Sequence, residues 1–418
     1  MPVEAILLLV LVVAAFLVRV WPLSTSHYWD ETVYLQNAEV ILGARHNYSE
    51  LASRPPLLSI LFAAVFLLWH SIYAAAIVTA LLNALGPLFL CLIGRRLFGK
   101  PAAAIAALLF AFLPFLVTAG NTLLSDSPAL TLVLACFWML VEGGERDSMK
   151  WFVGAGVMGA LAVLMRFASL PTIAVLGLLC LRPRRRVAAV LGFGVGFLAA
   201  FTPYLAWSRL RYGGFLTTLQ HGWANVAGSV DPPSYYLQHI PAIFSWLTVA
   251  GVALWVLSPI LTRNSPPHAT ESGLTGVWRW LRSWSLFLCA WIVIVLGYYM
   301  AIPHKEERYI LPLAPPLLLL AGCGLAQLVI LRKLAYRATA IALLFAAFAY
   351  TCAPAFARLR DPFISSYVSE EAAASDYLKG IAAPSAALYV NFNYPVFAYY
   401  TGLPTHVNLE QGGSFYNS

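Results

Sequence analysis

The sequence predicts an all-α polytopic membrane protein, a bundle of about 11 transmembrane helices. Hydrophobic residues make up 61% of the 418 residues and charged residues only 11%, which leaves too little polar surface to cover soluble domains. The apolar residues come in blocks of roughly 18 or more, the length an α-helix needs to cross about 30 Å of hydrocarbon. A soluble enzyme is therefore excluded.

The spans follow from the apolar blocks. The first, residues 3–23, is followed by a polar stretch and then by residues 57–69, an apolar run too short to cross the membrane. We therefore expect residues 24–70 to form an outer loop with juxtamembrane helices. Further spans are expected at about 72–93, 101–119, 127–141, 151–165, 169–181, 187–208, 241–260, 284–302, 310–331 and 338–355. The spans at 151–165 and 169–181 are short, which predicts that Arg166 between them lies below the outer membrane surface.

The charges predict the orientation of the bundle. With the N-terminus inside, 15 of the 26 lysines and arginines fall in cytoplasmic loops, together with only five of the 18 acidic residues. The net charge of +8 is therefore interpreted as a topology signal and not as a nucleic-acid surface. Residues 1–355 are expected to form the transmembrane domain, and residues 356–418 an outer C-terminal segment with a strand-like stretch at 387–392.

Four groups of charged residues lie at the outer span ends, where ionisable residues are costly and therefore informative. They are Asp30-Glu31 with Arg54, Asp126, Arg166, and residues 304–309 (His-Lys-Glu-Glu-Arg-Tyr). Each also has a purely structural interpretation: Asp126 as a helix N-cap, Arg166 as a snorkelling side chain, and residues 304–309 as a solvated helix end. Together they place carboxylates and cations on one membrane face, which suits chemistry on a substrate with an anionic leaving group.

The motifs at these positions resemble those of a known superfamily. They are Trp29-Asp30-Glu31, Arg54-Pro55-Pro56-Leu57, Arg95-Arg96-Leu97-Phe98-Gly99 and the run from His304 to Pro312, of which HKEERY is similar to the HKEERF signature of lipid-linked mannosyltransferases. Over roughly residues 1–355 the chain resembles the GT-C glycosyltransferases, nearest to the branch of dolichyl-phosphate-mannose protein mannosyltransferases and aminoarabinose transferases.

The resemblance implies transfer of a single sugar, mannose-like or another hexose or pentose, from a polyprenyl-phosphate carrier to a hydroxyl acceptor, with inversion. The acceptor is a protein or a lipid-linked glycan, and the reaction takes place on the extracytoplasmic face of the plasma membrane, or of the endoplasmic reticulum in a eukaryote. By position, Asp30 matches the acidic residue proposed as catalytic base, and Glu31 matches its partner. The branch often has Lys-Gly-Pro where this chain has Arg166, Phe167 and Ala168, which leaves the role of Arg166 open.

A physical account fits this resemblance. A carboxylate at the position of Asp30 can accept the proton of the attacking hydroxyl, and partial desolvation is expected to raise its pKa. The departing phosphate gains negative charge, which Lys305, Arg308, His304, Arg54 and Arg166 are candidates to stabilise. These cations, and the lack of a DxD triplet, predict a reaction without metal or other cofactor.

Other interpretations of the sequence remain. The stretch 212–236, which contains His221, is either part of an acceptor groove or an interfacial helix, and Asp126 is either a second acidic site or a cap. The main alternative function is a transporter or flippase of a lipid-linked sugar, although its charges are expected near the bilayer midplane and in two related halves. A subunit without chemistry would have no use for the outer charges.

Overall fold

The computed structural model describes residues 3–21, 29–44, 49–224, 231–261, 284–329, 331, 334–357, 370–383, 385–390 and 393–407. Its helices are α1 (Val3–Val20), α2 (Trp29–Ile41), α3 (Leu57–Phe66), α4 (Ile72–Phe98), α5 (Lys100–Phe112), α6 (Pro114–Gly120), α7 (Asp126–Arg146), α8 (Met149–Met165), α9 (Leu170–Gly177), α10 (Arg186–Tyr212), α11 (Thr217–Ala224), α12 (Tyr235–Leu261), α14 (Trp284–Ala301), α15 (Ala314–Val329), α16 (Leu334–Ala357), α18 (Glu370–Ile381) and α19 (Tyr394–Thr401). Short 3₁₀ helices are η1 (Phe167–Ser169), η2 (Leu178–Leu181) and η3 (Glu307–Leu313), and the strands are β1 (Leu388–Val390) and β2 (Thr405–Val407).

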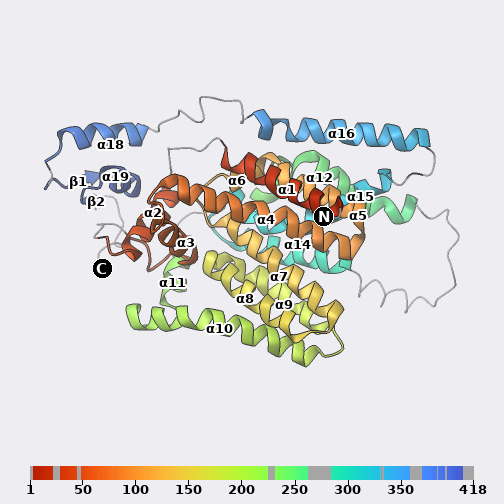
Figure 1. The fold of residues 1–418 in the computed structure, drawn as a ribbon, viewed down its shortest axis with the longest axis horizontal. Helices are drawn as coiled ribbons and strands as arrows, with labels where there is room; N and C mark the ends of the chain where they lie inside the picture. The colour runs from red at the N-terminus through yellow and green to blue at the C-terminus, as the bar shows by residue number, and fades with distance from the viewer. Residues whose placement is uncertain are drawn as a thin grey trace.

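The long helices form a bundle and run in broadly the same direction, with α2, α3, α11 and the C-terminal elements gathered at one end (Figure 1). Among the described residues, eight helices are long and apolar enough to cross a membrane, or nine if the bent pair α5 and α6 counts as one span. The predicted all-α membrane fold is confirmed, and the chain is a multi-pass membrane protein. The two short expected spans correspond to α8 and to residues 167–181, which fall below the length of a full span, so the count of eleven stays a prediction.

The bend between α5 and α6 depends on a buried arginine that the sequence did not single out. Pro114 has no N–H, so the carbonyl of Phe110 loses its usual helical donor, and the chain bends by 57° there. Arg19 of α1, which is only 1% exposed, donates to the carbonyls of Phe110 (3.1 Å) and Ala111 (2.8 Å). The guanidinium of Arg19 thus replaces the hydrogen bonds that the break removes.

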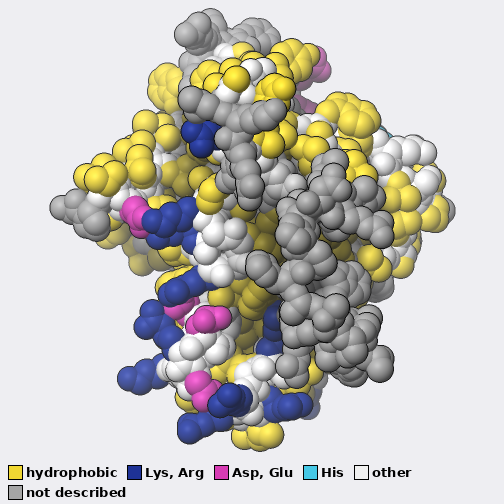
Figure 2. Space-filling model, turned by 90° about the vertical axis from the view of Figure 1, so that its right-hand side faces the viewer, with side chains coloured by type: hydrophobic (Ala, Val, Ile, Leu, Met, Phe, Trp, Pro, Cys, Tyr) yellow, Lys and Arg dark blue, Asp and Glu magenta, His cyan; other side chains and the backbone are white. Residues whose placement is uncertain are grey.

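The opposite end of the bundle from α2 and α3 carries basic residues. Figure 2 looks at this end and shows lysine and arginine side chains with a few acidic ones among them. Glu142 pairs with Arg96 (2.8 Å) and Arg146 (2.7 Å), and Glu4 pairs with Arg95 (2.7 Å) and Lys100. These residues lie at the helix ends for which the charge distribution predicts a cytoplasmic position.

The described part of the C-terminal segment packs against α2. Tyr394 and Ala398 of α19 bury Val33, and Gln36 donates to the carbonyl of Pro395 (2.9 Å). β1 and β2 pair in parallel. β1 covers only Leu388–Val390 of the strand expected at 387–392, and residues 391–392 lie outside the described residues. α2, which carries Asp30, is therefore held between the bundle and the C-terminal segment.

Close packing of α8 on α10 predicts the effect of one substitution. A Cβ atom on Gly156 would lie 2.0 Å from the backbone oxygen of Phe193, so Gly156→Ala forces the two helices apart. We expect this substitution to lower the free energy of unfolding in detergent by about 1–3 kcal/mol. The effect is measured by thermal unfolding. Gly194→Ala is the matched control, because a Cβ there meets no atom within 4 Å. Equal stability of both variants would contradict this view of the interface.

Candidate active site

An open cleft of about 570 Å³ lies at the end of the bundle where α2 and α3 are found. Four segments meet there: the start of α2, the loop before α3, the loop between α6 and α7, and the segment that leads into η3. The lining residues are Trp29, Asp30, Glu31, Arg54, Thr122, Leu124, His304, Glu306, Arg308 and Tyr309. Two of the four charged groups picked out from the sequence therefore line this cleft: Asp30-Glu31 with Arg54, and residues 304–309.

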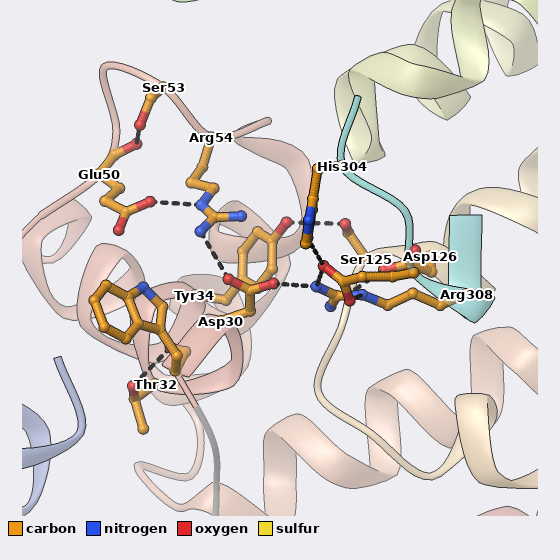
Figure 3. A network of polar contacts seen from close by, with 12 residues as sticks. Asp30, Thr32, Tyr34, Glu50, Ser53, Arg54, Ser125, Asp126, His304 and Arg308 are labelled. Carbon is orange, nitrogen blue, oxygen red and sulfur yellow. Dashed lines mark hydrogen bonds and ion pairs between the residues drawn. The ribbon is translucent and has the colours of Figure 1, made fainter. Parts of the chain in front are cut away.

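Asp30 lies between two arginines (Figure 3). Its Oδ1 accepts a hydrogen bond from Nη2 of Arg54 (2.7 Å), and its Oδ2 accepts one from Nη2 of Arg308 (2.6 Å). Burial alone would raise the pKa of Asp30, but the positive charges of Arg54 and Arg308 outweigh burial and lower that pKa to about 2. The expected rise in the pKa of Asp30 is thus wrong for this arrangement, because two counter-ions sit on the carboxylate.

Each of the two arginines is also bound to a glutamate. Nε of Arg54 donates to Glu50 (2.5 Å), whose side chain is 1% exposed. Nε of Arg308 donates to Glu306 (2.5 Å), and Nη2 of Arg308 donates to the other oxygen of Glu306 (3.0 Å). The two guanidinium groups are therefore positioned from behind by glutamates while they face Asp30. Glu306 belongs to the segment that the sequence indicated, but no separate role for it was predicted.

Asp126 and Arg166 form a second ion pair beside the first. Nη1 of Arg166 lies 2.8 Å from Asp126, and Nη1 of Arg308 lies 3.9 Å from the same carboxylate. The guanidinium of Arg166 also stands 4.9 Å from the ring centre of Tyr309. The N-cap position of α7 is Ser125, not Asp126, and no side-chain capping bond is present there. The N-cap interpretation of Asp126 is therefore wrong, and Arg166 reaches the cleft only through Asp126 and Tyr309.

Glu31 holds the loop between α6 and α7. Its buried carboxylate accepts a hydrogen bond from the backbone N–H of Leu123 (2.7 Å). One helical turn away, the hydroxyl of Tyr34 is 2.9 Å from that of Ser125. These bonds tie the loop that leads to Asp126 onto α2. Glu31 thus fixes the position of this loop relative to the start of α2, next to Asp30.

Lys305 lies away from the cleft, contrary to its expected place beside a phosphate. Its Nζ donates to the backbone carbonyls of Ile302 (2.7 Å) and Asp231 (3.0 Å), and its backbone N–H donates to the Asp231 carboxylate (2.8 Å). His304, in contrast, lines the cleft, with Nε2 at 3.1 Å from Glu306. Lys305 thus joins the segment before η3 to Asp231. Residues 225–230, which precede Asp231, lie outside the described residues.

His221 is exposed on α11 and is not part of the cleft lining. α11 itself lies next to the site, because a Cβ on Gly222 would come within 2.7 Å of the backbone oxygen of Ser53. On the other side of the cleft, the rings of Trp29 and Tyr394 meet edge to face, with centres 4.6 Å apart. Within the described residues, no group of three or more His, Cys, Asp or Glu is placed to hold a metal ion.

The solved structures that this chain resembles define its fold. The crystal structure of ArnT from Cupriavidus metallidurans bound to undecaprenyl phosphate matches with a TM-score of 0.68 and 18% identity, covering 97% of this chain and 85% of that one. The oligosaccharyltransferase of Archaeoglobus fulgidus, tethered with an acceptor peptide, matches with a TM-score of 0.62 and 14% identity, covering 96% of this chain and 64% of that one. The chain therefore has the fold of the GT-C membrane glycosyltransferases, as the motifs indicated.

Part of the sequence also matches a known protein family. Residues 53–207 match the dolichyl-phosphate-mannose-protein mannosyltransferase family. No curated protein sequence matches the chain. The matched region begins one residue before Arg54 and includes Asp126 and Arg166.

The environment of Lys305 predicts a structural role. Lys305→Met removes a buried ammonium group and leaves backbone carbonyls without their donor, which costs about 1–3 kcal/mol. We expect a lower thermal unfolding temperature in detergent. Lys305→Arg, which keeps donors at this position, is expected to fall between Lys305→Met and the unaltered protein. A Lys305→Met variant as stable as the unaltered protein would refute this role.

Proposed function

We propose that this protein is a membrane glycosyltransferase that moves one sugar from a polyprenyl-phosphate carrier to a hydroxyl acceptor. The observation that carries the proposal is Asp30, a carboxylate in an open cleft with two arginines beside it. The family match and the fold support the same class of enzyme. The site groups charges at one end of the bundle, which a transporter with midplane sites would not need.

The lipid carrier is supported by the character of the structural relatives. One ArnT structure is bound to undecaprenyl phosphate, and one structure of the archaeal oligosaccharyltransferase AglB is in complex with dolichol-phosphate and an inhibitory peptide. A cleft at the end of a membrane bundle suits a substrate whose sugar phosphate is in water and whose tail is in lipid. We therefore assign the donor to this class, with a protein or a lipid-linked glycan as acceptor.

The chemistry follows from the residues at the cleft. The acceptor hydroxyl attacks the anomeric carbon while Asp30 takes its proton, and the bond from that carbon to the phosphate oxygen breaks with its electrons left on the phosphate. Attack opposite to the leaving phosphate inverts the anomeric centre. Arg54 and Arg308 stabilise the charge that develops on the phosphate, and His304 adds a further donor at the cleft wall.

The site belongs on the extracytoplasmic side under this proposal. It lies at the end of the bundle opposite the basic helix ends, which by the positive-inside rule face the cytoplasm. The membrane is then the plasma membrane, or the endoplasmic reticulum in a eukaryotic host. The transferred sugar is a hexose or pentose that fits above Asp30.

Replacement of the proposed base tests this function. Asp30→Asn is expected to reduce the transfer rate by about a hundred-fold to ten-thousand-fold, measured in vitro with a radiolabelled polyprenyl-phosphate sugar. The matched control is Asp147→Asn at the other end of the bundle, where Asp147 has a left-handed backbone that asparagine also tolerates. The control should transfer sugar normally. An Asp30→Asn variant that retains most of its activity would remove Asp30 from this role.

Chelation tests the proposed source of positive charge. Because Arg54 and Arg308 already supply two cations at the cleft, we expect transfer to continue in excess EDTA at the rate measured without it. The assay uses protein that has been dialysed against chelator beforehand. Activity that disappears and returns only when a divalent ion is added would contradict a metal-free mechanism.

A further inference from the structure

The two arginines beside Asp30 make the same pattern of bonds. In Arg54, Nε is bound to Glu50 and Nη2 to Asp30. In Arg308, Nε is bound to Glu306, and Nη2 donates both to Asp30 and to the other oxygen of Glu306. Each guanidinium is thus anchored at Nε by its own glutamate and contacts Asp30 with a terminal nitrogen. A terminal nitrogen can change partner while the anchor at Nε stays in place.

A phosphate that enters this cleft competes with Asp30 for the same donors. Arginine forms its strongest contacts with planar or tetrahedral oxyanions through paired N–H groups. The neighbouring charged groups Glu31 and Arg166 already have other partners: Glu31 accepts a hydrogen bond from the N–H of Leu123, and Arg166 is paired with Asp126. The charged and titratable side chains around Asp30 are Glu31, Tyr34, Glu50, Arg54, Asp126, Arg166, His304, Glu306, Arg308 and Tyr309.

The proposed reaction itself moves negative charge from Asp30 to the phosphate. Before transfer, Asp30 and the phosphodiester each carry one negative charge. After transfer, Asp30 has gained the acceptor's proton, and the phosphate has gained the electron pair of the broken bond and is a monoester. A counter-ion that leaves Asp30 for the phosphate therefore follows the charge. Binding of the phosphate and transfer of the sugar therefore both favour the movement of the arginines from Asp30 to the phosphate.

We infer that Arg54 and Arg308 are exchangeable counter-ions, which pair with Asp30 until the donor phosphate takes them over and thereby free Asp30 to accept the proton of the acceptor. The inference rests on the proposed function. It orders the reaction, because the base becomes competent only when the lipid phosphate is in place. Burial alone raises the pKa of Asp30, so an Asp30 without its arginines holds a proton readily.

Infrared difference spectroscopy tests the exchange. Undecaprenyl phosphate is added to the purified protein in detergent at about pH 5, where an Asp30 paired with both arginines is ionised because its pKa is about 2. We expect binding to produce the carbonyl band of a newly protonated carboxyl group. The band should shift when the protein carries isotope-labelled aspartate, and it should be lost in Asp30→Asn.

Asp126→Asn is the matched variant, since Asp126 also faces Arg308 and Arg166, and it should keep the band. Binding without a new band, or a band that survives in Asp30→Asn, overturns the exchange. If the same preparation still transfers sugar, the proposed function stands and only the exchange is refuted. A protein that neither binds undecaprenyl phosphate nor transfers sugar refutes both. The isotope shift identifies an aspartate even if one variant fails to fold.

Discussion

The ion pairs of Asp30 hold together parts of the chain that are distant in sequence. Arg54 lies 24 residues away, before α3, and Arg308 lies 278 residues away, in η3. Charges at the edge of a low-dielectric region persist only when they are paired. Under the exchange that we infer, an anionic substrate enters the cleft by replacing Asp30 as the partner of the two arginines. The position of α2, the roles of Glu50 and Glu306, and the proposed order of substrate binding all depend on this constraint.

The sequence singled out most of the charged residues that line the cleft, but not how their side chains are arranged. Asp30, Arg54, Arg308 and His304 line the cleft as their motifs indicated. Lys305 does not, and the backbone explains why: Glu306 is extended, with φ −130° and ψ 147°, so neighbouring side chains alternate in direction. His304, Glu306 and Arg308 share one side, and Lys305 lies on the other. A prediction that treated this segment as an extended strand with alternating side chains would have placed Glu306, and not Lys305, in the cleft.

Hydropathy predicted the positions of the apolar helices, of which eight or nine among the described residues are long enough to span a membrane. It did not predict the helix break at Pro114. Each expected span corresponds to helical residues, since the apolar length alone requires it. The break before Pro114 and its partner Arg19 were not foreseen, because their relation depends on α1 lying beside α5. The pKa of Asp30 was missed for a similar reason. Desolvation can be inferred from one residue, whereas the two arginines that outweigh it come from segments far apart in the sequence, the loop before α3 and η3.

The contact between α19 and α2 has a consequence for biogenesis. Gln36 and Pro395 are 359 residues apart, and Val33 is fully buried against Tyr394 and Ala398. During synthesis α2 is made among the first helices and can pack on α3, but Val33 is covered by α19 only after α19 has been translated and delivered to the same side of the membrane. The helix that carries Asp30 thus gains its contact with α19 late, after the chain has inserted the spans between α2 and α19.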